Sequence, residues 1–242
     1  ALGLPYAQTM EALGGDLYVR KATLEYHASA RCEDLLDVGI RCARIGTSSM
    51  LFSAAVFRQG ELLVSGELVY VFADPHSQTS RPVPPALREV LMGFEAGEPM
   101  REIRVGDWPA LGEAASAIRS EVFIAEQKIP QEMEWDADDA TSVHAVAFNR
   151  LGFPIATGRL LRDAPGIARI GRMATRQAVR GGGIARAVLE ALMDRARERG
   201  DREVRLSAQT SAAAFYARAG FVTLGAEFEE AGIAHIEMTR AL

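Results

Sequence analysis

The pattern of apolar residues changes near residue 97, and this change limits the possible folds more than any other feature of the chain. Before it, four runs have the composition and the short separating turns of strands, at residues 17–28, 35–45, 48–58 and 61–73. After it, helical spacings alternate with strand-like runs. The segment 95–99, with two glutamates, a glycine and a proline, has the composition of a linker. We predict two domains, residues 1–96 and 97–242, in a chain of the α+β class.

In the first domain the predicted strands form an antiparallel meander, because the turns at Gly46 and at residues 59–60 are short. Residues 68–72 are apolar on both faces, so we expect the fourth strand to be buried on both. Prolines at positions 82, 84 and 85 end the meander and begin a helix that keeps its apolar spacing as far as Phe94.

The second domain is predicted to open with a helix capped by Asp107, whose apolar face ends at Val122. Two more helices are expected at residues 183–199 and 211–220. The predicted strands of this domain span residues 143–149, 155–161, 167–175, 203–208, 221–229 and 233–239.

Composition excludes several classes of function. Lys and Arg total 27 against 32 for Asp and Glu, a net charge of -5, so we expect no nucleic-acid partner. No apolar run approaches the roughly 20 residues that cross a bilayer, so we expect no membrane partner. Cys32 and Cys42 lie in strand-like sequence and the four histidines are scattered, which predicts no metal and a cytoplasmic location. Because Ala1 opens the chain inside an apolar stretch, we expect the natural polypeptide to begin upstream.

A glycine turn at residues 180–185 joins the strand that ends at Thr175 to the following helix. The free N–H groups of a helix start attract anions, glycines let a phosphate approach the backbone, and Arg180 adds a charge, so the turn suits a pyrophosphate. The alternative is that the glycines merely make a tight connection. The nucleotide P-loop is excluded because Gly-Lys followed by Ser or Thr is missing, and the dinucleotide fingerprint fails because Arg186 stands where its third glycine belongs.

The same turn resembles the Arg/Gln-x-x-Gly-x-Gly/Ala signature of the GNAT superfamily of N-acetyltransferases, matched here by Arg180, Gly183 and Ala185. The resemblance continues through residues 170–174 and 214–221. Residues 123–134 and 232–238 are similar to one bacterial branch of that superfamily, so the likeness covers nearly all of residues 101–242. It implies an α/β acyltransferase domain with a mixed sheet.

The resemblance also implies roles for individual residues. The backbones of Met173, Ala174 and Thr175 would align the pantetheine arm of coenzyme A or acetyl-CoA. Tyr216 matches the tyrosine that protonates the departing thiolate, a reasonable transfer for a phenol of pKa about 10. By spacing alone, Tyr216 beside Phe215 would be a core residue. The pyrophosphate would lie on Arg180, Gly181, Gly182, Gly183, Ile184 and Ala185.

The group that accepts a proton from the acceptor amine is less determined. The amine must be neutral to attack a thioester, which calls for a base or a water relay. From the branch-specific segments we select Glu134 and His235 as catalytic candidates. A surface or structural role is the alternative for every candidate. The candidates are Glu126, Glu134, Asp136, His144 and His235.

The first domain resembles the C-terminal portion of hotdog-fold acyl-CoA thioesterases of the 4-hydroxybenzoyl-CoA type, through residues 2–6, 25–28 and 82–91. In those enzymes the catalytic acid usually lies in a segment before the part seen here, so no thioesterase catalytic residue is predicted. The domain is then an intact enzyme, a degenerate dimerisation module, or a half whose beginning was lost. Hotdog domains associate by extending their sheets, which implies a homo-oligomer.

Together these resemblances predict an N-acyltransferase that moves an acetyl group from acetyl-CoA to a small-molecule or peptide amine, fused to a thioesterase-like domain. Two alternatives stay open. One is an acyl-CoA thioesterase with an accessory GNAT domain, and the other is a module that binds acyl-CoA without catalysis.

Overall fold

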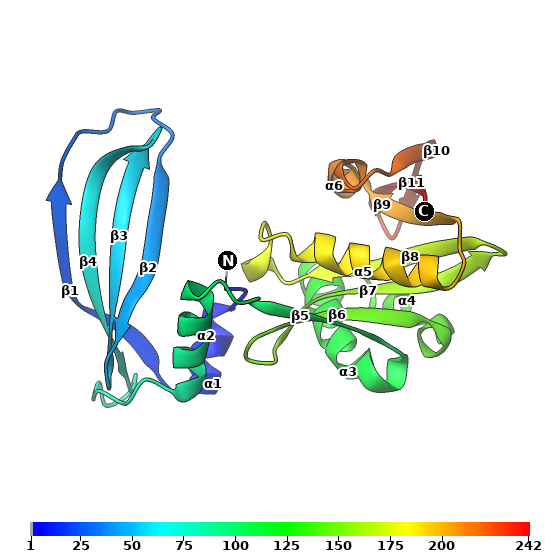
Figure 1. The fold of residues 1–242 in the computed structure, drawn as a ribbon. Coiled ribbons are helices and arrows are strands. Elements are labelled where there is room, and N and C mark those ends of the chain that lie inside the picture. The colour runs from blue at the N-terminus through cyan, green and yellow to red at the C-terminus, as the bar shows by residue number, and fades with distance from the viewer. Residues whose placement is uncertain (1) are drawn as a thin grey trace. The chain divides into compact units, whose positions relative to one another are not determined.

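A computed structural model describes residues 2–242 of the chain (Figure 1). These residues form two compact units, residues 2–100 and residues 101–242, which are described separately. The first unit holds an antiparallel sheet with helices, and the second holds a mixed sheet with helices. The predicted fold class is therefore confirmed.

The first unit is a four-stranded sheet in the order β1-β4-β3-β2, antiparallel throughout. Its elements are α1 (Tyr6–Leu13), β1 (Asp16–Tyr26), β2 (Asp37–Ile45), β3 (Ser49–Arg58), β4 (Glu61–Ala73) and α2 (Pro85–Glu95). The predicted four-strand meander holds for β2, β3 and β4, each next to its neighbour in the chain, but the first strand departs from it, because β1 pairs with β4 and not with β2.

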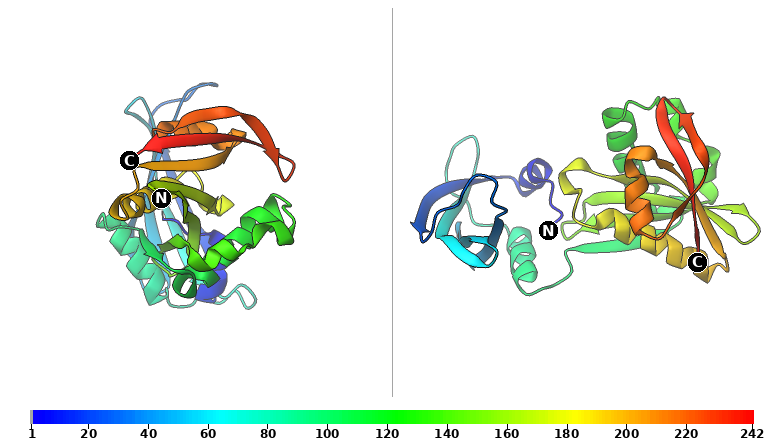
Figure 2. Two further views of the ribbon diagram at one scale, coloured as in Figure 1. Left: turned by 90° about the vertical axis from the view of Figure 1, so that its right-hand side faces the viewer. Right: turned by 90° about the horizontal axis from the view of Figure 1, so that it is seen from above.

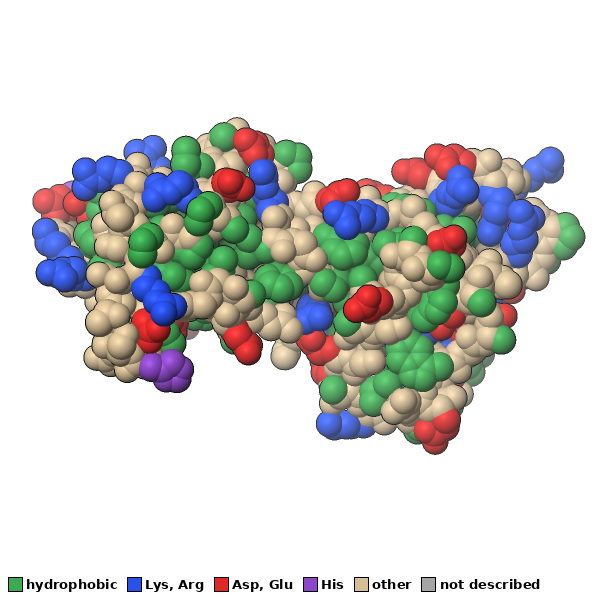
Figure 3. All heavy atoms as spheres, turned by 90° about the horizontal axis from the view of Figure 1, so that it is seen from below, with side chains coloured by type: hydrophobic (Ala, Val, Ile, Leu, Met, Phe, Trp, Pro, Cys, Tyr) green, Lys and Arg blue, Asp and Glu red, His purple; other side chains and the backbone are tan. Residues whose placement is uncertain are grey.

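The core of the first unit gathers near its helices rather than along the whole sheet. Its buried cluster consists of Met10, Met50, Phe72, Val83, Leu87 and Leu91. Gly15 is required beside this cluster, because a Cβ there would lie 2.4 Å from the ring of Phe72. The expectation that β4 is buried on both faces is wrong, since residues 68–71 are only half-buried. Away from the helices nothing in the described unit covers the sheet, and exposed apolar side chains are seen on its surface in Figure 3, at the left.

The second unit is a seven-stranded sheet in the order β10-β11-β9-β8-β7-β6-β5. All its neighbours are antiparallel except β8 and β9, which are parallel. Its strands are β5 (Arg101–Gly106), β6 (Val143–Asn149), β7 (Pro154–Ala164), β8 (Ile167–Thr175), β9 (Glu203–Gln209), β10 (Val222–Glu230) and β11 (Ile233–Ala241). Its helices are α3 (Trp108–Arg119), η1 (Ser120–Glu126), α4 (Gln131–Glu134), η2 (Ala137–Thr141), η3 (Gln177–Val179), α5 (Ile184–Glu198), η4 (Thr210–Ala212) and α6 (Ala213–Arg218).

Helices α5 and α3 cover opposite faces of this sheet (Figure 1). On β6, Ala145 and Ala147 belong to the buried cluster that contains the apolar side of α5, whereas Val146 and Phe148 belong to the cluster that contains α3. Alternate residues of a strand point to opposite faces, so the two clusters form two core layers. The layers hold the strand ends that border the site.

Helix α3 begins where the sequence predicted, because the side chain of Asp107 accepts a hydrogen bond from the backbone N–H of Ala110. The helix then passes directly into the π-helix η1, a rare form that is frequent at functional sites. The sequence did not predict α1, η1, α4, η2, η3 or β5. Strand β5 was not predicted because apolar and polar residues alternate only weakly along it. Four of its six residues are exposed, and they include Arg101 and Glu102.

Candidate active site

Strands β8 and β9 part soon after they begin. Their parallel ladder is limited to three residue pairs, Ile167–Arg169 with Glu203–Arg205. Beyond this point β9, β10 and β11 turn away from the rest of the sheet (Figure 2, left). Within residues 2–242, no strand pairs with the β9-facing edge of residues 170–175. Apart from the carbonyl oxygen of Thr175, which accepts from Arg180 Nε, the backbone groups on that edge are available to an extended ligand.

Two cavities open where the strands diverge. The first, here called the turn cavity, has a volume of about 480 Å³ and lies against residues 180–186, β8 and α6. The second, the strand cavity, has a volume of about 390 Å³ and lies against β8, β9, residues 123–134 and the β10–β11 hairpin. Both are lined by Met173, Ala212 and Tyr216, so they meet at these three residues.

The turn cavity has the features of an anion site. Gly181 and Gly183 have φ angles of +82° and +73°, a left-handed conformation that favours glycine. Gly183 is the N-cap of α5 and has no side chain to satisfy the first N–H groups of that helix. Arg180, Arg186 and Arg218 line the cavity as well. Helix N–H groups and arginines together attract phosphates.

Most of the predicted cofactor-binding residues line the turn cavity. The lining includes Met173, Thr175, Arg180, Gly181, Gly183, Ile184 and Ala185. Gly182 does not line it, and Ala174 is buried in the cluster around α3. Ala174 faces away because neighbouring residues of a strand alternate between the two faces, which leaves only its backbone toward the edge of β8.

Tyr216 lies where the two cavities meet. Its side chain is only 8% exposed, and burial raises its pKa to about 12. Its ring makes edge contacts with Phe215 and Phe221, at centroid distances of 4.9 and 6.0 Å. The two interpretations made from the sequence are compatible, because the ring packs in the core while the residue also borders both cavities. With this pKa the phenol carries its proton at neutral pH, and burial makes it a weaker acid than a free tyrosine.

Strand β8 carries a bulge at the junction of the cavities. Arg172 has a φ of +52°, and the register with β7 shifts between residues 157 and 159, so Arg172 and Met173 stand opposite Gly158. A Cβ on Gly158 would lie 2.4 Å from the sulfur of Met173. Gly158 therefore makes room for the bulge, which is a common device for re-aiming side chains next to sites.

His235 borders the strand cavity from β11. Its Nδ1 lies 2.8 Å from the carbonyl oxygen of Ile233. A carbonyl can only accept, so Nδ1 carries the proton in this contact and Nε2 of the neutral ring is left as an acceptor. The ring of Phe228 stacks against the imidazole at a centroid distance of 5.9 Å. This is the tautomer that a proton-accepting histidine needs.

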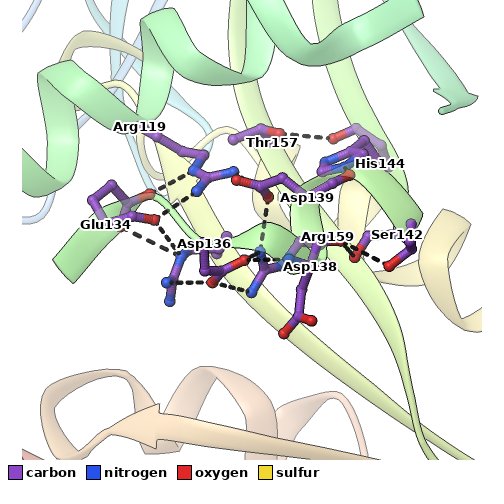
Figure 4. A network of polar contacts seen from close by, with 12 residues as sticks. Arg119, Glu134, Asp136, Asp138, Asp139, Ser142, His144, Thr157 and Arg159 are labelled. Carbon is purple, nitrogen blue, oxygen red and sulfur yellow. Dashed lines mark hydrogen bonds and ion pairs between the residues drawn. The ribbon is translucent and has the colours of Figure 1, made fainter. Parts of the chain in front are cut away.

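Glu134 lies at the floor of the strand cavity and is 2% exposed. Arg119 Nε donates to its Oε1 at 2.5 Å (Figure 4). Arg172 Nε lies 3.4 Å from its Oε2. Burial raises the pKa of Glu134 above its ordinary value, although Arg119 and Arg172 act in the opposite direction. A carboxylate held by two guanidinium groups is a structural anchor for them.

The contacts of Glu134 belong to a larger network (Figure 4). Asp139 accepts from both Arg119 and Arg159 at 2.8 Å. Asp136 binds Arg159 through both of its oxygens and also accepts from Arg172 at 3.0 Å. The network holds three arginines and three carboxylates, so its positive and negative charges are equal in number. Burial opposes ionisation of Asp139, but the two arginines outweigh it and hold its pKa below the ordinary value.

The other two candidates for the base lie elsewhere. His144 is buried, its Nε2 is 2.9 Å from the carbonyl oxygen of Asp139, and it lines neither cavity. Burial lowers the pKa of His144. Glu126 forms a bidentate ion pair with Arg180 of the glycine turn. The structure thus brings Tyr216, Glu134 and His235 to one cavity.

Several residues of the site were missed from the sequence, above all Arg119. One signal was present, because Arg119 falls four residues after Ala115 on the apolar face of α3, where a charged residue is unusual. Gln127 and Gln209 were missed too. The side-chain amide of Gln209 donates to Gln127 at 2.9 Å, which links η1 to β9 beside the strand cavity. No pattern in the sequence identifies that pair.

Among residues 2–242 no group of three or more His, Cys, Asp or Glu side chains is arranged to hold a metal ion. No helix in the same range combines the length and apolar character that crossing a membrane requires.

Comparison with known proteins agrees with this geometry. The model of the acetyltransferase (GNAT) domain matches residues 110–242, more than half of the chain, and the thioesterase superfamily model matches residues 6–65. The uncharacterized N-acetyltransferase YjcF of Bacillus subtilis is 33% identical over 124 residues, which cover 51% of this chain and 87% of that protein.

Solved structures give the same result. The crystal structure of an acyl-CoA N-acyltransferase from Pseudomonas aeruginosa is similar with a TM-score of 0.53 and 34% identity, covering 58% of this chain and 99% of that one. Escherichia coli ElaA matches with the same TM-score and coverage at 27% identity. The chain therefore belongs to the GNAT acetyltransferase family, and it carries in front a hotdog-like domain of the thioesterase superfamily.

Proposed function

We propose that the second unit transfers an acyl group, acetyl in the simplest case, from acyl-coenzyme A to the nitrogen of an amine. The observation that carries this proposal is the position of Tyr216, which borders both the cavity of the glycine turn and the cavity of His235. A reacting group held between the two cavities would lie beside a proton donor.

The residues present fit coenzyme A. The diphosphate would be held by the first N–H groups of α5 and by Arg180, and the open edge of β8 offers backbone groups to the pantetheine arm. The turn cavity contains arginines and no carboxylate in its lining, in a chain of net charge -5. When bound, acyl-coenzyme A supplies an activated thioester carbonyl.

The side chains then divide the proton transfers between them. Nε2 of His235 accepts a proton from the acceptor ammonium, directly or through a water, so that the neutral nitrogen can form the new C–N bond. As the C–S bond breaks, the hydroxyl of Tyr216 donates a proton to the sulfur, which leaves as a thiol. Formation of the C–N bond leaves the nitrogen positively charged, and this nitrogen gives up a second proton that restores the Tyr216 hydroxyl, while His235 releases the first proton to solvent. Glu134 acts in this scheme by holding Arg172 at the floor of the cavity and by tying it to the buried Arg119.

Release of free thiol from acetyl-CoA, measured with and without a panel of small-molecule amines and lysine peptides, tests the proposal. We expect release that depends on the amine. For Tyr216→Phe we expect kcat to fall about 100-fold, because general acid catalysis is worth roughly 10² to 10⁴. An unchanged kcat for Tyr216→Phe across pH would remove its role as the acid, and tight binding of acetyl-CoA without turnover would indicate a non-catalytic module.

A second candidate function is hydrolysis of an acyl-CoA thioester by the first unit, which the match of residues 6–65 to the thioesterase superfamily favours. The same assay distinguishes hydrolysis from acyl transfer, because hydrolysis releases thiol without an amine and would persist in Tyr216→Phe.

We also propose that the first unit makes a homo-oligomer, supported by exposed apolar residues on its edge strands such as Tyr18 on β1 and Val38 on β2. Analytical ultracentrifugation would show a monomer if this is wrong.

A further inference from the structure

Arg180, the arginine of the glycine turn, is already bound by a carboxylate from another part of the chain. Its Nη1 and Nη2 donate to the two carboxylate oxygens of Glu126 at 2.7 and 2.6 Å, and its Nε donates to the carbonyl oxygen of Thr175 at 3.0 Å. The terminal edge of a guanidinium is the part that matches a phosphate in a bidentate contact. In Arg180 this edge is occupied by Glu126.

The pair is placed so that a ligand can compete for it. Arg180 lines the turn cavity, whereas Glu126, the last residue of η1, does not. The two side chains are 41% and 37% exposed. Ion pairs this exposed are worth only about 0.2–1 kcal/mol, which a diphosphate of higher charge can replace.

Glu126 also lies next to a contact of the other cavity. Gln127 follows it in the chain and accepts the hydrogen bond from Gln209, and Gln209 stands opposite His235 in the ladder of β9 and β11. Residues 126 and 127 thus contact the glycine turn on one side and the strand cavity on the other. A shift of Glu126 would be passed to Gln127 through the backbone.

We propose that Glu126 is an internal competitor of the cofactor's diphosphate for Arg180, and that its displacement links the turn cavity to the strand cavity. The proposal rests on the proposed function, since it takes coenzyme A as the ligand of the turn. In this proposal Glu126 weakens binding of the cofactor. Its displacement also transmits the binding event to the strand cavity, where the acceptor would lie.

The opposite interpretation is that Glu126 helps binding by holding Arg180 in place. The two differ in sign. If Glu126 competes, removal of its charge tightens the binding of coenzyme A, and it does so only while Arg180 is present. If Glu126 positions Arg180, the same change weakens binding.

Calorimetric titration of the full chain with coenzyme A decides between them. For Glu126→Gln we expect the Kd to fall about two- to fivefold, the fold-change that corresponds to the worth of an exposed pair. For Arg180→Gln we expect the Kd to rise, and for the double variant we expect the value of Arg180→Gln alone. Glu132→Gln, an exposed change of the same charge on α4, should leave the Kd unchanged.

An equal or higher Kd for Glu126→Gln would overturn the proposal, and so would a gain that persists beside Arg180→Gln, because that gain would reflect net charge alone. Failure of the wild-type chain to bind coenzyme A at all would instead overturn the proposed function. Unchanged tryptophan fluorescence of each variant shows that the second unit is folded, since both tryptophans, Trp108 and Trp135, lie in it.

The link to the strand cavity has its own test. Inorganic diphosphate has no pantetheine arm, so an effect on the strand cavity that is present in the wild type and lost in Arg180→Gln must pass through the protein from the glycine turn. We expect it to shift the NMR signal of the His235 imidazole in the wild type and to shift it much less in Gln127→Ala, which cannot accept the bond from Gln209. Equal shifts in both proteins, or none in the wild type, would refute the link.

Discussion

The two cavities of the second unit are built in different ways. The turn cavity is made mostly of backbone, from left-handed glycines and the start of α5, whereas the strand cavity rests on side chains that come from α3, α4, η2, β7 and β8. A backbone site needs particular residue types at fixed spacing along one stretch of chain. A side-chain site needs partners that only the tertiary fold brings together. We therefore expect substitutions in the two cavities to differ in how much stability and how much ligand binding they remove.

The largest effect is expected at the network beneath the strand cavity. Arg119→Met removes the partner of Glu134 and Asp139 and leaves both carboxylates buried, which should destabilise the second unit by about 3–5 kcal/mol. Urea unfolding followed by tryptophan fluorescence reports this unit, because Trp108 and Trp135 both lie close to Arg119. Arg197→Gln, which breaks an exposed pair with Asp194 on α5, is the control and should cost less than about 1 kcal/mol. Similar losses in the two variants would mean that the network does not hold the cavity floor.

The next effect depends on pH. Because the folded-state pKa of Asp139 is lowered, its contacts stabilise the fold above the ordinary pKa of about 4, and the contribution is lost as pH falls through the lower folded value. Asp139→Asn should therefore cost about 1.5–3 kcal/mol at pH 7, and the difference from the wild type should shrink toward pH 3. Urea midpoints at the two pH values measure it. A constant difference would show that Asp139 contributes through shape and not through charge.

The smallest change in stability is expected at the glycine turn, where the effect on binding is larger. Gly183→Ala should cost about 1–2 kcal/mol of stability, the price of a left-handed alanine. Gly200, with a φ of +87° beyond the other end of α5, is a matched control, and Gly200→Ala should cost the same. Only Gly183→Ala should weaken coenzyme A binding, by about tenfold, or 1.4 kcal/mol. Equal affinities of both variants for coenzyme A would show that the glycine turn does not bind this ligand.

This contrast explains what could be predicted from the sequence. The cap of α3 at Asp107 and the glycine turn each depend on residues a few positions apart, so both can be predicted from the sequence. Tyr216 required the family pattern, because its spacing alone indicates core packing. The ion network could not be predicted as a whole, since its members lie between residues 119 and 172 on five elements and the loop at Asp136.

The first unit shows the same limit in another form. The strand pattern predicted the bounds of β1 to β4 within a few residues, but it overestimated the burial of β4. The apolar pattern of a strand shows which side chains can be buried, and it does not show whether another element packs against them. Core formation depends on the helices, and these lie against one end of the sheet only.

The short ladder between β8 and β9 divides the large sheet into a four-stranded part, β5 to β8, and a three-stranded part, β9 to β11, that share α5 as a common support. A ligand arm lying along the open edge of β8 would take the place of rungs that the protein does not form. Cofactor binding would then resemble completion of a sheet, and the amide protons of residues 171–175 that face β9 would pass from rapid to slow exchange with solvent.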